Sequence, residues 1–302
     1  MNGLLRAKLP AMSRLAQTIL RRPYKILFAI TLVAQAVLAA GAPVNVIYPR
    51  PETENDARNE YYTQVLVLVL KKSGGQYQAV PNKSAMGQSR AILQLENNDG
   101  LDVIWTMTSR EREAAMLPVR IPIDKGLLGW RIFLVKKRDL DKFDDVHSLD
   151  DLKKYSAGQG HDWPDAEILR ANGLPVVTGG SYAGLFRMLQ ADRFQYFPRG
   201  ILEIVSEKAA HPEFGLEIEP TLLLHYPAAL YFFVNKKNIA LAQILERGLA
   251  VAIEDGSFDK LFEQFNGELI KQAHLKTRHV IEVSNPLPDE TPLSNVGLWF
   301  RP

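Results

Sequence analysis

Short apolar runs alternate with longer amphipathic segments along the chain from residue 44. The first predicted elements are a strand over 44–48, a helix that Asn55 or Asp56 can cap and that runs to Lys72, a strand over 77–80, a helix from Ser84 to Glu96, and a strand over 102–106. This order predicts a parallel sheet with right-handed crossovers. Ligands bind at the carboxyl ends of the strands in such sheets, where Tyr48, Thr106 and Thr108 stand.

A second unit of the same kind follows a crossing over 122–129. Its predicted elements are strands over 130–135, 156–160, 175–178 and 193–197, with helices from Ser148, over 166–172 and over 181–192 between them. Beyond it, apolar runs predict strands over 216–224 and 228–234, and helical periodicity predicts helices over 239–254 and 258–265. The pattern therefore predicts an α/β protein with two lobes, and 302 residues are enough for both.

The first 40 residues differ from the rest. They hold six basic residues and no acidic one, and an apolar run over 26–40 ends in small residues. That run is shorter than the ~20 residues of a membrane span. A basic, then apolar, then small-residue order is typical of a secretory signal peptide. We expect a signal peptide over 1–42 and a periplasmic protein. An uncleaved N-terminal anchor is the alternative, and Met12 is an alternative start.

The composition excludes several kinds of chemistry. The chain has no cysteine, which excludes a disulfide framework, thiol catalysis and a thiolate metal site. Without the six basic residues of the signal segment, 30 of the 36 Lys and Arg residues face 34 Asp and Glu residues, so the rest of the chain carries about −4. A mildly acidic protein offers no electrostatic case for nucleic acid.

Four segments, taken in order, resemble one known family. Residues 101–112 (LDVIWTMTSRER) resemble its Asp-apolar stretch followed by Thr-x-Thr-Pro-Glu-Arg, and 148–152 (SLDDL) its Ser-Leu-x-Asp-Leu entry to a second lobe. Residues 181–194 resemble its Ser-to-Gly-Arg helix, and 233–262 its closing helix pair. The family is the type II periplasmic solute-binding proteins, in the branch that serves polar amino acid uptake (family 3). The resemblance spans most of 43–270.

The resemblance implies two α/β lobes joined by two crossover strands, with a ligand cleft between them. Lobe I would comprise 43–125 and 231–302, including the tail, and lobe II would comprise 126–230. Closure on the ligand would be a hinge motion. The implied function is an exported monomer that clamps a small polar, carboxylate-bearing solute, an amino acid or related organic acid, for an ABC transporter. The resemblance implies neither catalysis nor a cofactor. It implies a membrane permease as the partner.

In the family, an arginine at the end of the Thr-containing segment grips the ligand carboxylate. Arg110 and Arg112 both compete for that place, because the spacing here is one residue longer. Thr108 would add a hydroxyl or cap the next helix. Trp105 and Thr106 stand at the end of the preceding strand. A solvated helix face is the alternative for both arginines.

The second lobe would offer the ligand a helix start at 160–163, which contains His161, Asp162 and Trp163. Trp163 would stack on the ligand or pack the hinge. No other metal-ligating residues stand at a suitable sequence spacing from His161, so we expect no zinc site.

Arg199 stands where the family has an aspartate for the ligand's ammonium. Either Asp162, Glu203 or Glu52 replaces that aspartate, or the ligand is an anion rather than a standard α-amino acid. Alternatively, Arg199 pairs with Glu203 one turn later.

Two other function classes compete with transport. A sensor would report the same ligand to a membrane signalling partner. An enzyme of the same fold would be a dehydratase or a serine hydrolase, since 179–183 (GGSYA) resembles a nucleophile elbow and Asp255 with His274 or His279 would complete a triad. Ser181 also has a simpler role as a helix N-cap.

Overall fold

The computed structural model describes residues 42–51, 59–287 and 298–302. The predicted signal peptide, except for Ala42, lies outside these residues, as do Glu52 and the predicted caps Asn55 and Asp56. Residues from Val44 to Pro302 belong to one compact unit. Among the described helices, none is long and apolar enough to cross a membrane.

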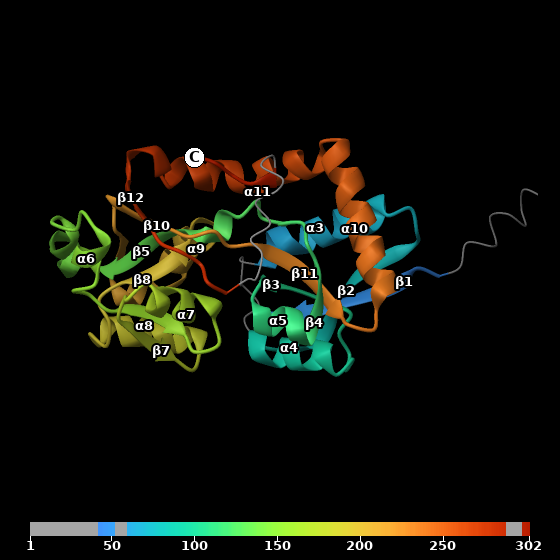
Figure 1. Cartoon of the computed structure of the whole chain (residues 1–302), viewed down its shortest axis with the longest axis horizontal. Helices are drawn as coiled ribbons and strands as arrows, with labels where there is room; N and C mark the ends of the chain where they lie inside the picture. The colour runs from blue at the N-terminus through green and yellow to red at the C-terminus, as the bar shows by residue number, and fades with distance from the viewer. Residues whose placement is uncertain (1–41, 52–58, 288–297) are drawn as a thin grey trace, which may run out of the picture. The chain divides into compact units, whose positions relative to one another are not determined.

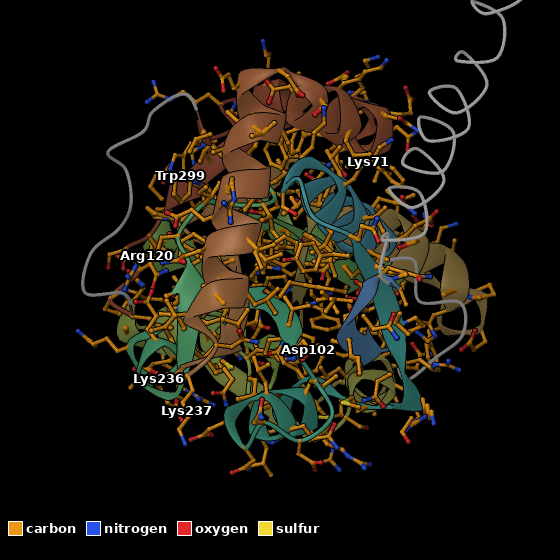
Figure 2. All side chains as sticks on the ribbon, turned by 90° about the vertical axis from the view of Figure 1, so that its right-hand side faces the viewer. Lys71, Asp102, Arg120, Lys236, Lys237 and Trp299 are labelled. Carbon is orange, nitrogen blue, oxygen red and sulfur yellow. The ribbon has the colours of Figure 1, made fainter. Side chains whose placement is uncertain are left out.

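The first lobe contains two short sheets that meet edge to edge. Its strands are β1 (Val44–Arg50), β2 (Tyr77–Ala85), β3 (Val103–Met107), β4 (Met116–Val119) and β11 (Leu230–Asn235). β1 and β2 are parallel, while β11 lies between β3 and β4 and is antiparallel to both. Asp102, labelled in Figure 2, joins the two sheets, because its backbone N–H donates to Ile47 O at 2.8 Å and its carboxylate accepts from Ile47 N at 2.7 Å.

Helices cover both faces of this lobe. They are α3 (Glu60–Lys72), α4 (Gln88–Glu96), α5 (Arg110–Ala115) and α10 (Ile239–Glu254). α3 packs on α10 through fully buried side chains such as Val65 and Leu245. The two helices approach closely at Gly248, where a Cβ would lie 2.1 Å from Val69 O. Only glycine fits this crossing.

The second lobe is built around one sheet of mixed direction. Its strands are β5 (Trp130–Lys136), β6 (Ala157–Gly160), β7 (Val176–Gly179), β8 (Phe197–Gly200), β9 (Leu216–Ile218), β10 (Leu222–His225) and β12 (His279–Glu282). The order is β12-β10-β5-β8, with β9 also on β5. An isolated β-bridge between Ala157 and Tyr196 joins the parallel pair β6-β7 to this sheet, next to β8. Its α-helices are α6 (Leu149–Leu152), α7 (Pro164–Ala171), α8 (Tyr182–Gln190) and α9 (Ile201–Ala210).

Two antiparallel crossovers connect the lobes (Figure 1). The first, residues 120–129, links β4 to β5, and the second, residues 226–229, links β10 to β11. They run side by side, since Tyr226 N donates to Gly129 O at 3.2 Å and Ile123 N donates to Leu230 O at 3.0 Å. α11 (Ser257–Gln272) lies across both lobes and contacts α3, α10 and α9. Short 3-10 turns occupy Leu127–Gly129, Lys137–Phe143, Pro212–Phe214 and Leu275–Thr277.

The predicted α/β class with two lobes is confirmed, and the helix over 239–254 has the predicted bounds. The helix predicted from Ser84 is wrong at its start: β2 continues to Ala85, and α4 begins at Gln88 after the N-cap Gly87. The reason is a local turn, because the Asn82 side chain accepts from Ser84 N and donates to Gly100 O. β12, which the sequence grouped with lobe I, pairs with β10 in the sheet of the second lobe.

Candidate functional site

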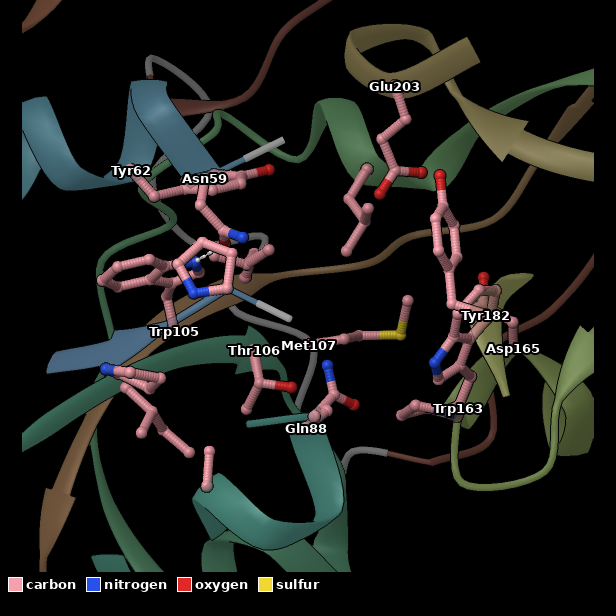
Figure 3. A pocket seen from close by; sticks show the side chains of 18 of the residues that line it. Asn59, Tyr62, Gln88, Trp105, Thr106, Met107, Trp163, Asp165, Tyr182 and Glu203 are labelled. Carbon is pink, nitrogen blue, oxygen red and sulfur yellow. Dashed lines mark hydrogen bonds between the residues drawn. The ribbon is translucent and has the colours of Figure 1, made fainter. Parts of the chain in front are cut away.

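A cavity of about 220 Å³ lies between the two lobes, at the carboxyl end of β3. Figure 3 shows side chains from both lobes around it. The polar and aromatic lining from the first lobe comprises Arg50, Asn59, Tyr62, Gln88, Trp105, Thr106 and Arg112. The corresponding lining from the second lobe comprises Arg131, Trp163, Asp165, Tyr182, Arg199 and Glu203. The volume suits a small metabolite.

Arg112 enters the cavity from α5. Ser109 caps this helix by accepting a hydrogen bond from Arg112 N at 3.2 Å. The guanidinium donates through Nη1 to Thr106 Oγ1 and Met107 O, and through Nη2 to Gln88 Oε1 at 2.6 Å. Burial lowers the pKa of Arg112 to about 10, so the side chain remains charged at neutral pH. It is a cation held firmly at the cavity wall.

Arg110 occupies the opposite side of α5. Its Nη2 donates to Pro286 O at 3.0 Å, and its backbone N–H donates to Leu287 O at 3.0 Å. Arg110 is exposed and does not line the cavity, whereas Arg112 is only 6% exposed. Of the two arginines that the sequence left open, Arg112 therefore faces the cleft.

Arg199 is neutralised by carboxylates of its own lobe. Its Nε and Nη2 form a bidentate pair with Glu207 at 2.7 and 2.6 Å, and Nη2 also meets Glu203 at 3.0 Å. The predicted pairing with Glu203 is thus confirmed. Trp163 and Phe197 each place a ring 4.8 Å from the guanidinium carbon. Burial opposes the charge, but the two glutamates outweigh it and raise the pKa of Arg199.

A second buried ion pair lies beside the first. Arg131 Nη2 meets Asp165 Oδ1 at 2.6 Å, and Arg131 Nε donates to the Tyr226 hydroxyl at 3.0 Å. The Tyr226 hydroxyl donates in turn to Asp165. The sequence pattern did not predict this group of Arg131, Asp165 and Tyr226. Arg131 itself was the available signal, because it is a charged residue inside the apolar run 130–135 and a buried charge needs a partner.

No family model matches the sequence, and no curated protein matches it. Solved structures do match: an ancestral arginine-binding protein bound to arginine has a TM-score of 0.54 at 18% identity, covering 75% of this chain and 99% of that chain. The chain has the periplasmic binding-protein fold. The fold that the sequence resemblance implied is thereby confirmed.

Two further solved structures have this fold. An arginine-specific periplasmic binding protein of Salmonella typhimurium matches with a TM-score of 0.54 at 16% identity, covering 74% of this chain and 99% of that chain. A histidine kinase sensor domain similar to periplasmic binding proteins matches with a TM-score of 0.54 at 15% identity, covering 74% and 96%. At such identities the likeness concerns the fold alone.

In this binding-protein fold, five of the ten predicted site residues line the cavity. They are Trp105, Thr106, Arg112, Trp163 and Arg199. The other five do not line it: Tyr48, Thr108, Arg110, His161 and Asp162.

Two of these five, Tyr48 and Thr108, contact neighbouring residues. Tyr48 packs on Trp105 with ring centroids 5.7 Å apart. The Thr108 hydroxyl donates to Glu113 at 2.5 Å, and the cap of α5 is Ser109 rather than Thr108. His161 is exposed, and within the described residues no cluster of His, Cys, Asp and Glu side chains could hold a metal ion.

The helix start expected to meet a ligand carboxylate is altered by a proline. α7 begins at Pro164, with Trp163 as its N-cap. Proline has no backbone N–H, so this helix start offers one donor fewer. Asp162, just before it, receives hydrogen bonds instead: its backbone oxygen accepts from Arg112 at 3.0 Å, and its carboxylate accepts from the Ser89 hydroxyl.

The charges are distributed unevenly between the two walls. The charged lining residues of the first lobe, Arg50 and Arg112, are both positive. In the second lobe, Arg131 and Arg199 face Asp165, Glu203 and, behind the wall, Glu207. The four charged lining residues of that wall balance one another, two positive and two negative, and Glu207 adds one carboxylate behind them. Among the described residues, the first wall is therefore positive, whereas the second wall combines arginines with carboxylates.

Proposed function

We propose that this chain is an exported solute-binding protein that clamps a small polar, carboxylate-bearing solute, an amino acid or related organic acid, for an ABC transporter. The observation that supports it best is Arg112, a buried cation at the wall of an interlobe cavity. The fold shared with amino acid-binding proteins of ABC transporters also supports it.

Arg112 would bind the ligand carboxylate by exchanging acceptors. Its Nη2 donates to Gln88 Oε1 and to Asp162 O. A carboxylate can replace both oxygens, because hydrogen bonds from the guanidinium to an anion are stronger than those from the same cation to neutral oxygens. The rest of the guanidinium stays anchored through Thr106 and Met107.

Glu203 would provide the complementary group on the second lobe. Its side chain is 19% exposed, and Figure 3 shows it reaching into the cavity from α9, opposite Asn59 and Trp105. Arg199 cannot receive an ammonium, but its charge is already balanced by Glu203 and Glu207. A zwitterion with its carboxylate at Arg112 and its cation at Glu203 would place each charge beside an opposite one, on the positive first wall and at a carboxylate of the second. We therefore favour an amino acid-like ligand over an anion.

Aromatic side chains would cover the ligand's apolar atoms. Trp105 is oriented by a hydrogen bond from Nε1 to Asn59 Oδ1 at 2.9 Å and packs on Tyr62 at 6.2 Å between centroids. Trp163 lines the other lobe. Walls of this kind add apolar contact while the polar groups fix orientation.

The test is a thermal-shift screen of the chain from residue 43 onward against amino acids and organic acids. We expect a stabilising amino acid, since a ligand at 100 times its Kd adds about 2.7 kcal/mol to the free energy of unfolding. Arg112→Ala should abolish the shift, whereas Arg110→Ala, two residues away on the exposed face, should preserve it. A shift that survives Arg112→Ala would place the ligand elsewhere. Glu203→Gln separates the two ligand classes, because it weakens binding of a zwitterion and not of a simple dicarboxylate.

A periplasmic sensor is the second candidate. The histidine kinase sensor domain with this fold supports it. A sensor would bind the same solute but pass the signal to a membrane partner without transport. Uptake of the labelled ligand by cells with and without the gene separates the roles: uptake that depends on the protein supports transport, and unchanged uptake supports the sensor.

The contacts of Ser181 offer no support for a hydrolase. Its Oγ accepts from Gly184 N at 3.2 Å and caps α8. The suggested partners are engaged elsewhere, with Asp255 paired to Lys72 and His279 Nε2 at 2.8 Å from His147 O. Ester hydrolysis that disappears in Ser181→Ala would nevertheless favour the enzyme.

A further inference from the structure

The segment 298–302 packs on the first crossover. Phe300 N donates to Lys125 O at 2.7 Å. The Trp299 ring covers Gly126, where a Cβ would lie only 2.2 Å from Trp299 Cε3. The Phe300 ring meets Trp130 edge-on, with centroids 6.5 Å apart. Two consecutive aromatic residues thus contact two positions within the first crossover and the first residue of β5.

The crossover has an unusual backbone at this point. Lys125 and Gly126 both have positive φ, at 54° and 72°. The left-handed conformation is unfavourable for a non-glycine residue, so other contacts must hold Lys125 in place. The Asp124 carboxylate accepts from Gly126 N at 3.0 Å and from Leu128 N at 2.9 Å. Hinge closure is absorbed by φ and ψ changes at a few residues such as these.

α11 holds the same residues from another side. Lys125 Nζ pairs with Asp259 at 2.8 Å and lies 5.0 Å from the centre of the Phe262 ring. Figure 2 labels Trp299, and the residues that share a surface hollow with it include Asp259 and Phe262 of α11. The crossover is therefore packed between α11 and the segment 298–302.

The contact reaches the second crossover as well. Trp130, which Phe300 touches, stacks on His225 with ring centroids 3.7 Å apart and an interplanar angle of 22°. His225 is the last residue of β10, immediately before the second crossover. The rings of Trp130 and His225 therefore connect Phe300 to β5 and β10, the two strands that adjoin the crossovers.

We propose that Trp299 and Phe300 are positioning residues for the hinge. The two rings act as a clip, that is, they hold the first crossover in the conformation it has when the lobes are in contact. The lobes are in contact here through Arg112 and Asp162. Neither aromatic residue lines the cleft cavity. Loss of the clip should therefore open the ligand-free protein without changing a residue of the binding site. The expected effect on ligand binding rests on the proposed function.

The experiment measures the distance between the lobes without ligand. The chain has no cysteine, so spin labels at Gln78→Cys on β2 and Arg170→Cys on α7 report on the two lobes alone. We expect Trp299→Ala with Phe300→Ala to shift the distance distribution to longer values, and the matched Arg301→Ala variant to leave it unchanged. Where a ligand is known, its Kd should rise by about tenfold in the double variant.

A purely structural role would give a different result. It would lower the Tm of the double variant but leave the distance distribution unchanged well below that Tm, and this outcome overturns the proposal. The distance measurement needs no ligand. A shifted distribution in a protein that binds no amino or organic acid would support the clip while the proposed function fails.

Discussion

Arg112 Nη2, in the first lobe, donates a hydrogen bond across the cleft to the backbone oxygen of Asp162 at 3.0 Å. A second contact reinforces it, because the Ser89 hydroxyl donates to the Asp162 carboxylate. The two lobes therefore touch at the edge of the cleft through Asp162. The same guanidinium is the proposed ligand-binding group, so lobe contact and ligand binding share one side chain.

Ser89→Ala tests whether this contact favours closure. A hydrogen bond to a charged group contributes about 1.5–3 kcal/mol, less at an exposed site, so we expect a several-fold rise in the ligand Kd. The ligand-free interlobe distance should also increase. Ser84→Ala, an exposed serine of β2, is the matched control. An unchanged distance in Ser89→Ala would show that the contact does not hold the lobes together.

Asp124 should give the protein a pH-dependent stability near pH 6. Complete burial raises the pKa of this carboxyl from 3.8 to about 6, against the lowering effect of hydrogen bonds from Leu128 and Gly126 and of nearby Arg131. Because the folded pKa lies above the unfolded one, the contribution to stability is full below pH ~4 and is lost as pH rises through 6. The loss amounts to about 3 kcal/mol.

Urea unfolding of Asp124→Asn at pH 4 to 7.5 checks this. The free energy of unfolding of the wild type, relative to the variant, should fall by a few kcal/mol as pH rises across that range. Asp141→Asn, at an exposed position, should show a constant difference from the wild type. A difference that is also constant for Asp124→Asn would contradict the raised pKa.

Substitution of one member of the Arg199–Glu207 pair should lower the free energy of unfolding more than substitution of both members. Arg199→Met removes the bidentate partner of a glutamate that is 2% exposed, and an unpaired buried charge costs about 3–5 kcal/mol. Arg199→Met with Glu207→Gln removes both charges and should recover part of that loss. Denaturant unfolding of both variants measures the change in the free energy of unfolding. Additive effects would show that the charges are not coupled.

Gly248→Ala should destabilise the packing of α10 on α3. The new Cβ would lie 2.1 Å from Val69 O, a backbone atom that cannot move alone, and overpacking of this kind typically costs 1–3 kcal/mol. Gly180→Ala is the control, since its Cβ would have open space around it and its φ is not in the left-handed region. Equal Tm values for the two variants would show that the helices can separate without cost.

The sequence predicted the fold well because apolar periodicity reflects burial directly. α10 kept its predicted bounds, and the alternation of strands and helices gave two α/β lobes. The choice between Arg110 and Arg112 depended on helix phase. Residues two apart on a helix point to opposite sides, so the start of α5 at Arg110, set by the Ser109 cap, decides which one enters the cleft.

The partners of Arg199 and Arg131 were harder to foresee. Glu203 was a candidate because it follows Arg199 by one turn, but Glu207 and Tyr182 complete the group from separate positions on α9 and α8. Asp165 reaches Arg131 only after the chain has passed through β6. Contacts between residues distant in sequence require the relative position of whole elements, which periodicity does not contain.

We propose that Arg112 binds the carboxylate of a small solute between the lobes. The decisive experiment is a crystal structure of the protein with the best thermal-shift hit. We predict the ligand carboxylate on the Arg112 guanidinium in place of Gln88 Oε1 and Asp162 O, with any cationic group of the ligand at Glu203. A ligand bound outside this cavity, with Arg112 still donating to Gln88 and Asp162, would contradict the claim.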